Sequence, residues 1–149
     1  MSEKNNHYSL IILRAALGII FFAHGSQKLL GWFGGYGFDA TMQFFQQIGI
    51  PAIIAMLIIL GEFFGGILIL SGLFTRVASA WISIIMLGAL FMVHLPNGFF
   101  LSGDKAGYEY VFALLFTALY LMLNGAGSLS LDRLIKNKVG NETLKKLVS

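Results

Sequence analysis

The chain has 149 residues, of which 57% are apolar and only 11% are charged, and its mean hydropathy is +0.80. Soluble domains carry about 25% charged residues, so a water-soluble monomer is excluded. The absence of cysteine excludes thiol nucleophiles, disulfides, Cys-ligated metals and iron–sulfur clusters. Five of the ten basic residues follow position 132, so the net charge of +3 indicates membrane topology rather than nucleic-acid binding.

Four apolar stretches predict transmembrane helices, because a bilayer core of about 30 Å needs roughly 20 apolar residues in a helix. They cover residues 10–30, 51–73, 77–95 and 106–123. The first has no small-x-small cleavage motif, which favours a retained span over a signal peptide. The fourth reaches full depth only if it starts near Ala106, which places Glu109 below the outer surface. The predicted fold is all-α, a four-helix transmembrane bundle in one domain over residues 1–149.

Two short segments outside the spans are predicted to be amphipathic helices on the membrane surface. Asp39 is a suitable N-cap for the first, in the first outer loop, with Phe44, Phe45 and Ile48 on one side. Ser130 is a suitable cap for the second, in the basic tail of residues 128–149. Its predicted lipid-facing residues are Leu131, Leu134 and Ile135, and its headgroup-facing residues are Arg133, Lys136 and Lys138.

The basic residues that flank the spans predict the orientation of the bundle. With four spans both termini share one side, and most Lys and Arg residues lie there. They are Lys4, Arg14, Arg76, Arg133, Lys136, Lys138, Lys145 and Lys146. The opposite side has only Lys28 and Lys105. We therefore expect a multi-pass protein of the cytoplasmic membrane with both termini cytoplasmic and with loops 31–50 and 96–105 outside.

Small residues at helical spacing in the second span favour close helix packing. They are Gly61, Gly65, Gly66, Ser71 and Gly72. Such residues let membrane helices approach closely, either inside one chain or across a homodimer. In a chain with four spans, we expect the neighbour to be a helix of the same chain.

The inner half of the predicted bundle contains Arg14, one turn from the cytoplasm. Asp132 follows the fourth span and Arg76 joins the second span to the third, both on the same side. We expect these three residues to form a structural ion cluster that closes the bundle at this end.

Five further ionisable side chains, contributed by all four spans, fall in the outer half when depth is counted at about 1.5 Å per residue. They are His24, Lys28, Glu62, His94 and Glu109. Burying each costs at least about 2.5–3.5 kcal/mol, so each needs a partner or a function. Lys28 could pair with Glu109, and either histidine could bond a helix carbonyl. The convergence of the whole set favours a binding pocket.

Of the ligands considered, a quinone best matches these side chains. It needs an apolar slot, hydrogen-bond donors at its carbonyl oxygens and an acid or base to move protons. His24, Lys28 and His94 are the candidate donors, and Glu62 or Glu109 the candidate proton carrier. Aromatic residues of the outer loop could stack on the ring. A haem between the two histidines is the alternative, whereas no HxxxH or ExxH spacing favours a metal site.

Three motifs in order resemble the DoxX family of small four-span bacterial and archaeal membrane proteins. Residues 14–29 read RxxLGxxFxxHGxxKL, residues 61–76 read GExxGGxxxxxGLxTR, and residues 125–132 read GxGxxSLD. The family is named after a subunit associated with a quinone-linked oxidation of sulfur compounds, and other members are linked to membrane redox complexes or to quinone and thiol stress.

The resemblance implies a small subunit or quinone-binding module of a quinone-linked redox or oxidative-stress system, working with a membrane redox partner, and possible membership of an oxidoreductase. Two other classes stay open. Glu62 could exchange protons for a hydrophobic cation in a proton-coupled transporter. The Gly61 and Gly65 face or the basic tail could dock a partner or a second copy in a non-catalytic scaffold.

Overall fold

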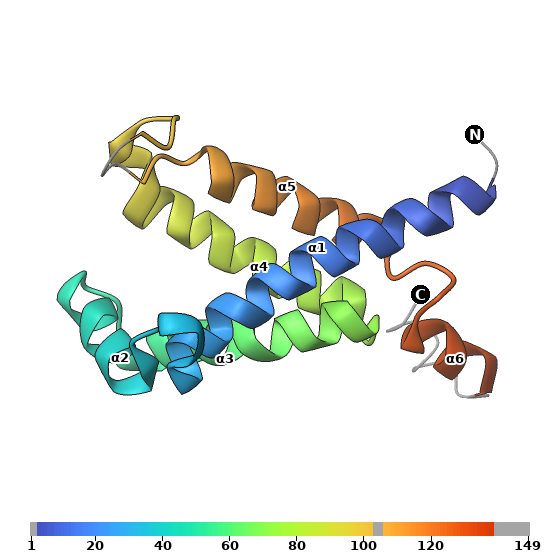
Figure 1. Cartoon of the computed structure of the whole chain (residues 1–149), viewed down its shortest axis with the longest axis horizontal. Coiled ribbons are helices and arrows are strands. Elements are labelled where there is room, and N and C mark those ends of the chain that lie inside the picture. The colour runs from blue at the N-terminus through green and yellow to red at the C-terminus, as the bar shows by residue number, and fades with distance from the viewer. Residues whose placement is uncertain (1–2, 103–105, 139–149) are drawn as a thin grey trace.

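A computed structural model describes residues 3–102 and 106–138 of the chain (Figure 1). This part is a bundle of four apolar helices that alternate in direction: α1 (Glu3–Leu30), α3 (Ala52–Ser71), α4 (Thr75–Ala89) and α5 (Glu109–Asn124). Shorter helices complete it: η1 (Trp32–Gly34), α2 (Gly37–Gln47), the π-helical turn η2 (Leu90–His94), η3 (Leu95–Asn97) and α6 (Leu131–Lys138). The predicted all-α bundle is confirmed.

Among the residues that the structure describes, three helical segments are long and apolar enough to cross a membrane: Tyr8–Leu30, Ala52–Ser71 and Thr75–Asn97. The fourth, α5, has 16 residues and measures about 24 Å. The sequence predicts its start near Ala106, which is three residues too early. The N–H groups of Tyr108 and Glu109 instead bond to the carbonyls of Gly98 and Phe99, at 3.0 and 2.9 Å, so the preceding segment pairs with the loop.

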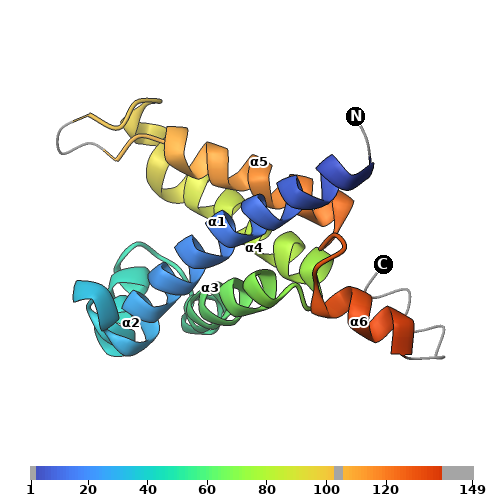
Figure 2. The ribbon, with the colours of Figure 1, turned by 45° about the vertical axis from the view of Figure 1, so that its right-hand side comes forward.

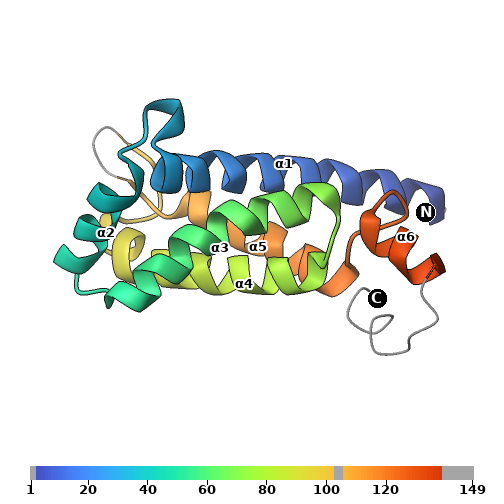
Figure 3. The ribbon, with the colours of Figure 1, turned by 90° about the horizontal axis from the view of Figure 1, so that it is seen from below.

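Glycines bring α1 against α3 and α3 against α4. A Cβ at Gly25 would collide with the backbone of Phe63, and a Cβ at Gly66 would collide with the backbone of Phe22. On another side of α3, Gly61 faces the Trp81 ring of α4. The small residues of the second span therefore pack inside this chain, as predicted. Figure 3 shows α1 and α4 on either side of α3.

The variant Gly66→Ala is expected to lower the free energy of unfolding by about 1–2 kcal/mol, because the added methyl group must push α1 away from α3. Gly88→Ala is the matched control, since a Cβ there meets no atom within 4 Å. Denaturant titration of both purified variants in detergent measures the difference. Equal stability of the two variants would contradict the close approach of α1 and α3.

Arg14 closes the bundle at the end that holds α6, which we call the α6 end. Its guanidinium is buried and donates to four backbone carbonyls. These belong to Ile69 (3.1 Å), Leu70 (3.0 Å), Ala126 (2.7 Å) and Leu129 (2.8 Å). The first two lie in the last turn of α3, at the negative end of the helix dipole, where a cation is favoured. Arg14 thus joins α1 to the end of α3 and to the segment after α5.

Asp132 is buried beside this contact, but its carboxylate caps α4. It accepts the N–H groups of Phe74 at 2.6 Å and Thr75 at 3.1 Å, at the positive end of the helix. Arg76 is exposed. The predicted ion cluster is therefore wrong in detail, because backbone groups rather than opposite charges satisfy most of the hydrogen-bonding capacity of Arg14 and Asp132.

Both predicted surface helices exist, with one boundary corrected. α2 begins at Gly37, so Asp39 lies in its first turn and is not the N-cap. The Ser130 hydroxyl oxygen accepts the Arg133 N–H at 3.3 Å and caps α6 as predicted. Figure 2 shows α6 beyond the ends of α3 and α5.

Candidate functional site

A cavity of about 870 Å³ lies at the opposite end of the bundle, which we call the α2 end. The end of α1, α2, the first half of α3, α4 and η2 form its walls. Most of its lining is apolar. The polar and ionisable side chains on its wall are Gln27, Tyr36, Thr41, Lys28, Glu62 and His94.

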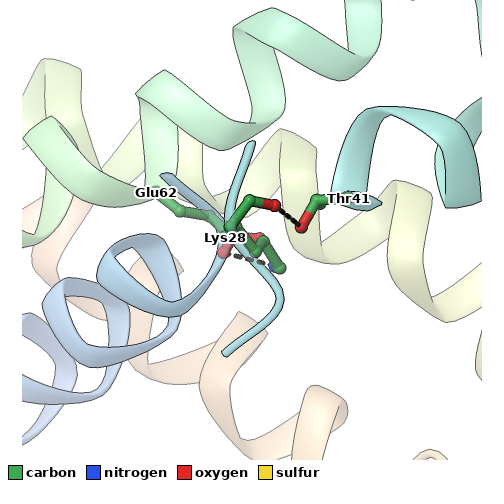
Figure 4. A network of polar contacts seen from close by, with 4 residues as sticks. Lys28, Thr41 and Glu62 are labelled. Carbon is green, nitrogen blue, oxygen red and sulfur yellow. Dashed lines mark hydrogen bonds and ion pairs between the residues drawn. The ribbon is translucent and has the colours of Figure 1, made fainter. Parts of the chain in front are cut away.

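Lys28 and Glu62 form an ion pair on this wall (Figure 4). The Lys28 ammonium donates to both carboxylate oxygens of Glu62. The close approach at Gly25 produces this contact, because it seats α1 on the backbone of Glu62 and Phe63, and Lys28 follows on the same face one turn later. The Glu62 side chain is 4% exposed and the Lys28 side chain 29%, so the lysine is the accessible partner.

His94 ends the π-helical turn η2 and lines the same cavity. Its Nδ1 lies 2.8 Å from the carbonyl oxygen of Ala106. Because that oxygen only accepts, Nδ1 carries the hydrogen of this bond. π-helical turns occur frequently at functional sites.

The other two predicted site residues do not line this cavity. His24 is exposed on α1. Glu109 starts α5, and its Oε1 accepts the N–H of Leu101 at 2.8 Å. The suggested pairing of Lys28 with Glu109 is therefore wrong, since each has another partner. His24 and His94 do not share the cavity, which removes the basis for a haem held between them. Within residues 3–102 and 106–138, no three His, Asp or Glu side chains are grouped to hold a metal ion.

The comparisons with known proteins agree with this architecture. The DoxX family model matches residues 9–95, more than half of the chain. The chain belongs to the DoxX family.

Several relatives of this DoxX-family protein match over most of their length. It is 35% identical over 130 residues to the putative oxidoreductase CatD of Bacillus subtilis, covering 87% of this chain and 89% of that protein. It is 33% identical over 137 residues to an uncharacterised protein of Haemophilus influenzae, covering 87% and 92%. It is 27% identical over 136 residues to the inner membrane protein YqjF of Escherichia coli, covering 91% and 98%. No solved structure matches it.

One wall of the cavity in this DoxX-family protein, the face of α4 and η2, was not predicted from the sequence. The wall consists of Trp81, Ile84, Ile85, Gly88 and Met92. Their spacing follows one face of a helix, which was the available signal. A Cβ at Gly88 meets no atom within 4 Å, so this glycine leaves a notch in the wall. Of the outer-loop aromatics expected near a ligand, the cavity is lined by Tyr36, Phe44 and Phe45.

Proposed function

We propose that this DoxX-family membrane protein binds a quinone at the α2 end, as a module of a quinone-linked redox system. The observation that carries the proposal is the Lys28–Glu62 ion pair on the wall of an otherwise apolar cavity. Ligand pockets measure about 300–1,000 Å³ and combine apolar walls with a few polar groups. A cavity of about 870 Å³ accommodates a quinone ring and the first part of an apolar tail.

The residues present fit a quinone in chemistry as well as in size. Two N–H groups of the Lys28 ammonium point to Glu62, and the third is available for a carbonyl oxygen. Glu62 positions this donor, and it is the carboxylate on the cavity wall that can take or return a proton. Converting a quinone to a quinol consumes two protons and two electrons. In our proposal Lys28 and Glu62 handle protons, and a membrane redox partner supplies the electrons.

The cavity mouth favours entry from the lipid. Four apolar residues of α3, α4 and η2 line the cavity and are also exposed: Ile54 (46%), Leu57 (38%), Ile84 (60%) and Met92 (54%). These helices are apolar enough to span a membrane, so their exposed faces meet acyl chains. A ligand dissolved in the bilayer can reach Lys28 without crossing water.

The distribution of basic residues supports an orientation with the α6 end in the cytoplasm. Arg76, Arg133 and Lys136 are exposed at that end. The positive-inside rule then assigns both termini to the cytoplasm and the cavity to the outer leaflet.

The transport and scaffold hypotheses gain less support from the same geometry. A cation exchanged at Glu62 would have to displace Lys28 from both carboxylate oxygens. The two glycines considered for docking, Gly61 and Gly65, face α4 of the same chain. A redox role is also consistent with the name of CatD, a putative oxidoreductase.

Filling the Gly88 notch tests the proposal. Trp32→Phe leaves Trp81, on the cavity wall, as the sole tryptophan. Titration of this purified protein with a short-tail ubiquinone analogue is expected to quench its fluorescence saturably. Adding Gly88→Leu is expected to weaken the apparent affinity by about tenfold or more, because the new side chain occupies ligand space.

Leu87→Phe is the matched control, since it enlarges an exposed side chain of α4 that does not line the cavity. Its quenching curve is expected to follow that of the parent protein. A Gly88→Leu curve that also follows the parent, or quenching that never saturates, would refute quinone binding at this site.

A further inference from the structure

A second, polar hollow of about 340 Å³ lies at the α6 end, between the end of α5 and α6. The polar side chains on its wall are Asn124, Ser130, Asp132, Arg133, Lys136 and Asn137. It is separate from the proposed quinone cavity, with which it shares no lining residue.

The hollow is suited to an anion. Arg133 and Lys136 are exposed, and no ion pair to either is formed by the residues that the structure describes. The one carboxylate on the wall, Asp132, is already engaged by the N–H groups of Phe74 and Thr75 at the start of α4. The two cations are therefore left with uncompensated positive charge.

The two faces of α6 differ in character, one being basic and the other apolar. At about 100° per residue, Arg133, Lys136 and Asn137 share one face of the helix. Leu131 and Leu134 lie on the opposite face, 41% and 55% exposed. A helix with one basic and one apolar face is typical of segments that lie in a membrane interface.

The position of the hollow along the bundle axis indicates where the anion comes from. It lies directly beyond Asn124, where α5 ends, at the same end of the bundle as the α3–α4 turn. In a membrane protein, the ends of the apolar helices coincide with the phospholipid headgroups. We propose that the hollow binds the phosphate of an anionic phospholipid headgroup through Arg133 and Lys136, while Leu131 and Leu134 contact the acyl chains.

Lys138 provides a control inside the same helix. The sequence alone predicts that it faces the headgroups with Arg133 and Lys136. The helical spacing instead puts position 138 on the side of Leu131 and Leu134, away from Arg133 and Lys136. Loss of the Lys138 charge therefore changes the net charge of α6 without changing the proposed site.

Native mass spectrometry of the delipidated full-length protein tests the proposal by titration with phosphatidylglycerol, phosphatidylcholine, diacylglycerol and inorganic phosphate. We expect phosphatidylglycerol to bind most tightly. The double variant Arg133→Gln/Lys136→Gln is expected to weaken that binding about thirtyfold, at about 1 kcal/mol per basic residue near a charged lipid. Lys138→Gln is expected to change it less than twofold.

The charge-conserving variant Arg133→Lys/Lys136→Arg is expected to keep its preference for phosphatidylglycerol, and this separates loss of charge from loss of fold. An equal effect of Lys138→Gln would overturn the proposal in favour of non-specific attraction to the helix. Wild-type binding by the double glutamine variant would overturn it outright. Displacement of the lipid by equimolar inorganic phosphate would reassign the hollow to a free anion.

Discussion

Replacing Arg14 with methionine is expected to lower the free energy of unfolding by about 3–5 kcal/mol. The methionine fills a similar space but donates no hydrogen bond to the four carbonyls that Arg14 now satisfies. Two of these carbonyls lie at the end of α3, and the other two belong to residues 126 and 129, after α5. Arg14 therefore holds α1 to both segments. Denaturant titration in mixed micelles measures the loss.

Arg133→Met is the matched control, because it removes an exposed arginine at the same end of the bundle. We expect a change within about 0.5 kcal/mol of the parent protein, as for most surface substitutions. If the Arg14→Met protein were as stable as this control, the four carbonyl contacts would not hold the bundle together.

Replacing Glu62 with leucine is expected to lower the free energy of unfolding by about 2–3 kcal/mol, because Lys28 loses its partner next to an apolar cavity. The value is below that of a fully buried pair because 29% of the Lys28 side chain is exposed. Adding Lys28→Met is expected to recover most of the loss, since apolar residues of similar volume often replace an ion pair without cost. A double-mutant cycle measures the coupling.

The stable double variant also separates structure from function. With Lys28 and Glu62 both apolar, the bundle is expected to fold, and the saturable quenching of Trp81 by a short-tail quinone is expected to weaken about tenfold or more. Quenching equal to that of the parent protein would show that the pair serves only packing. A double variant no more stable than Glu62→Leu would contradict the ion pair itself.

The helices were largely predictable because the lipid solvent imposes a long apolar stretch on each span. The predicted spans 10–30, 51–73 and 77–95 correspond to α1, α3, and α4 with its continuation through η2. The error at the start of α5 has a local cause. The N–H groups of Tyr108 and Glu109 bond to the carbonyls of Gly98 and Phe99 in the loop, and hydropathy does not report such a pairing.

Most of the ionisable residues of the site could be predicted from the sequence, but their arrangement around the helices could be predicted only in part. Counting depth brought Lys28, Glu62 and His94 to one half of the bundle, and the structure places these three on one cavity. Depth alone does not say around which side of a helix a residue lies. His24 therefore fell into the predicted set although it faces outward from the site. The Lys28–Glu62 pair depends on the close approach of the α1 and α3 backbones at Gly25. The two paired residues are 34 positions apart along the chain, so local sequence does not indicate that they meet.

The contacts of Arg14 also bear on the order in which the chain can assemble during synthesis. Two of its carbonyl partners lie 55 and 56 residues downstream, but the other two lie 112 and 115 residues downstream. α1 emerges from the ribosome long before its last two partners exist. The bundle is therefore locked at this end only when the segment after α5 has been translated, and a nascent chain that stops earlier retains an arginine with half of its hydrogen bonds unmade.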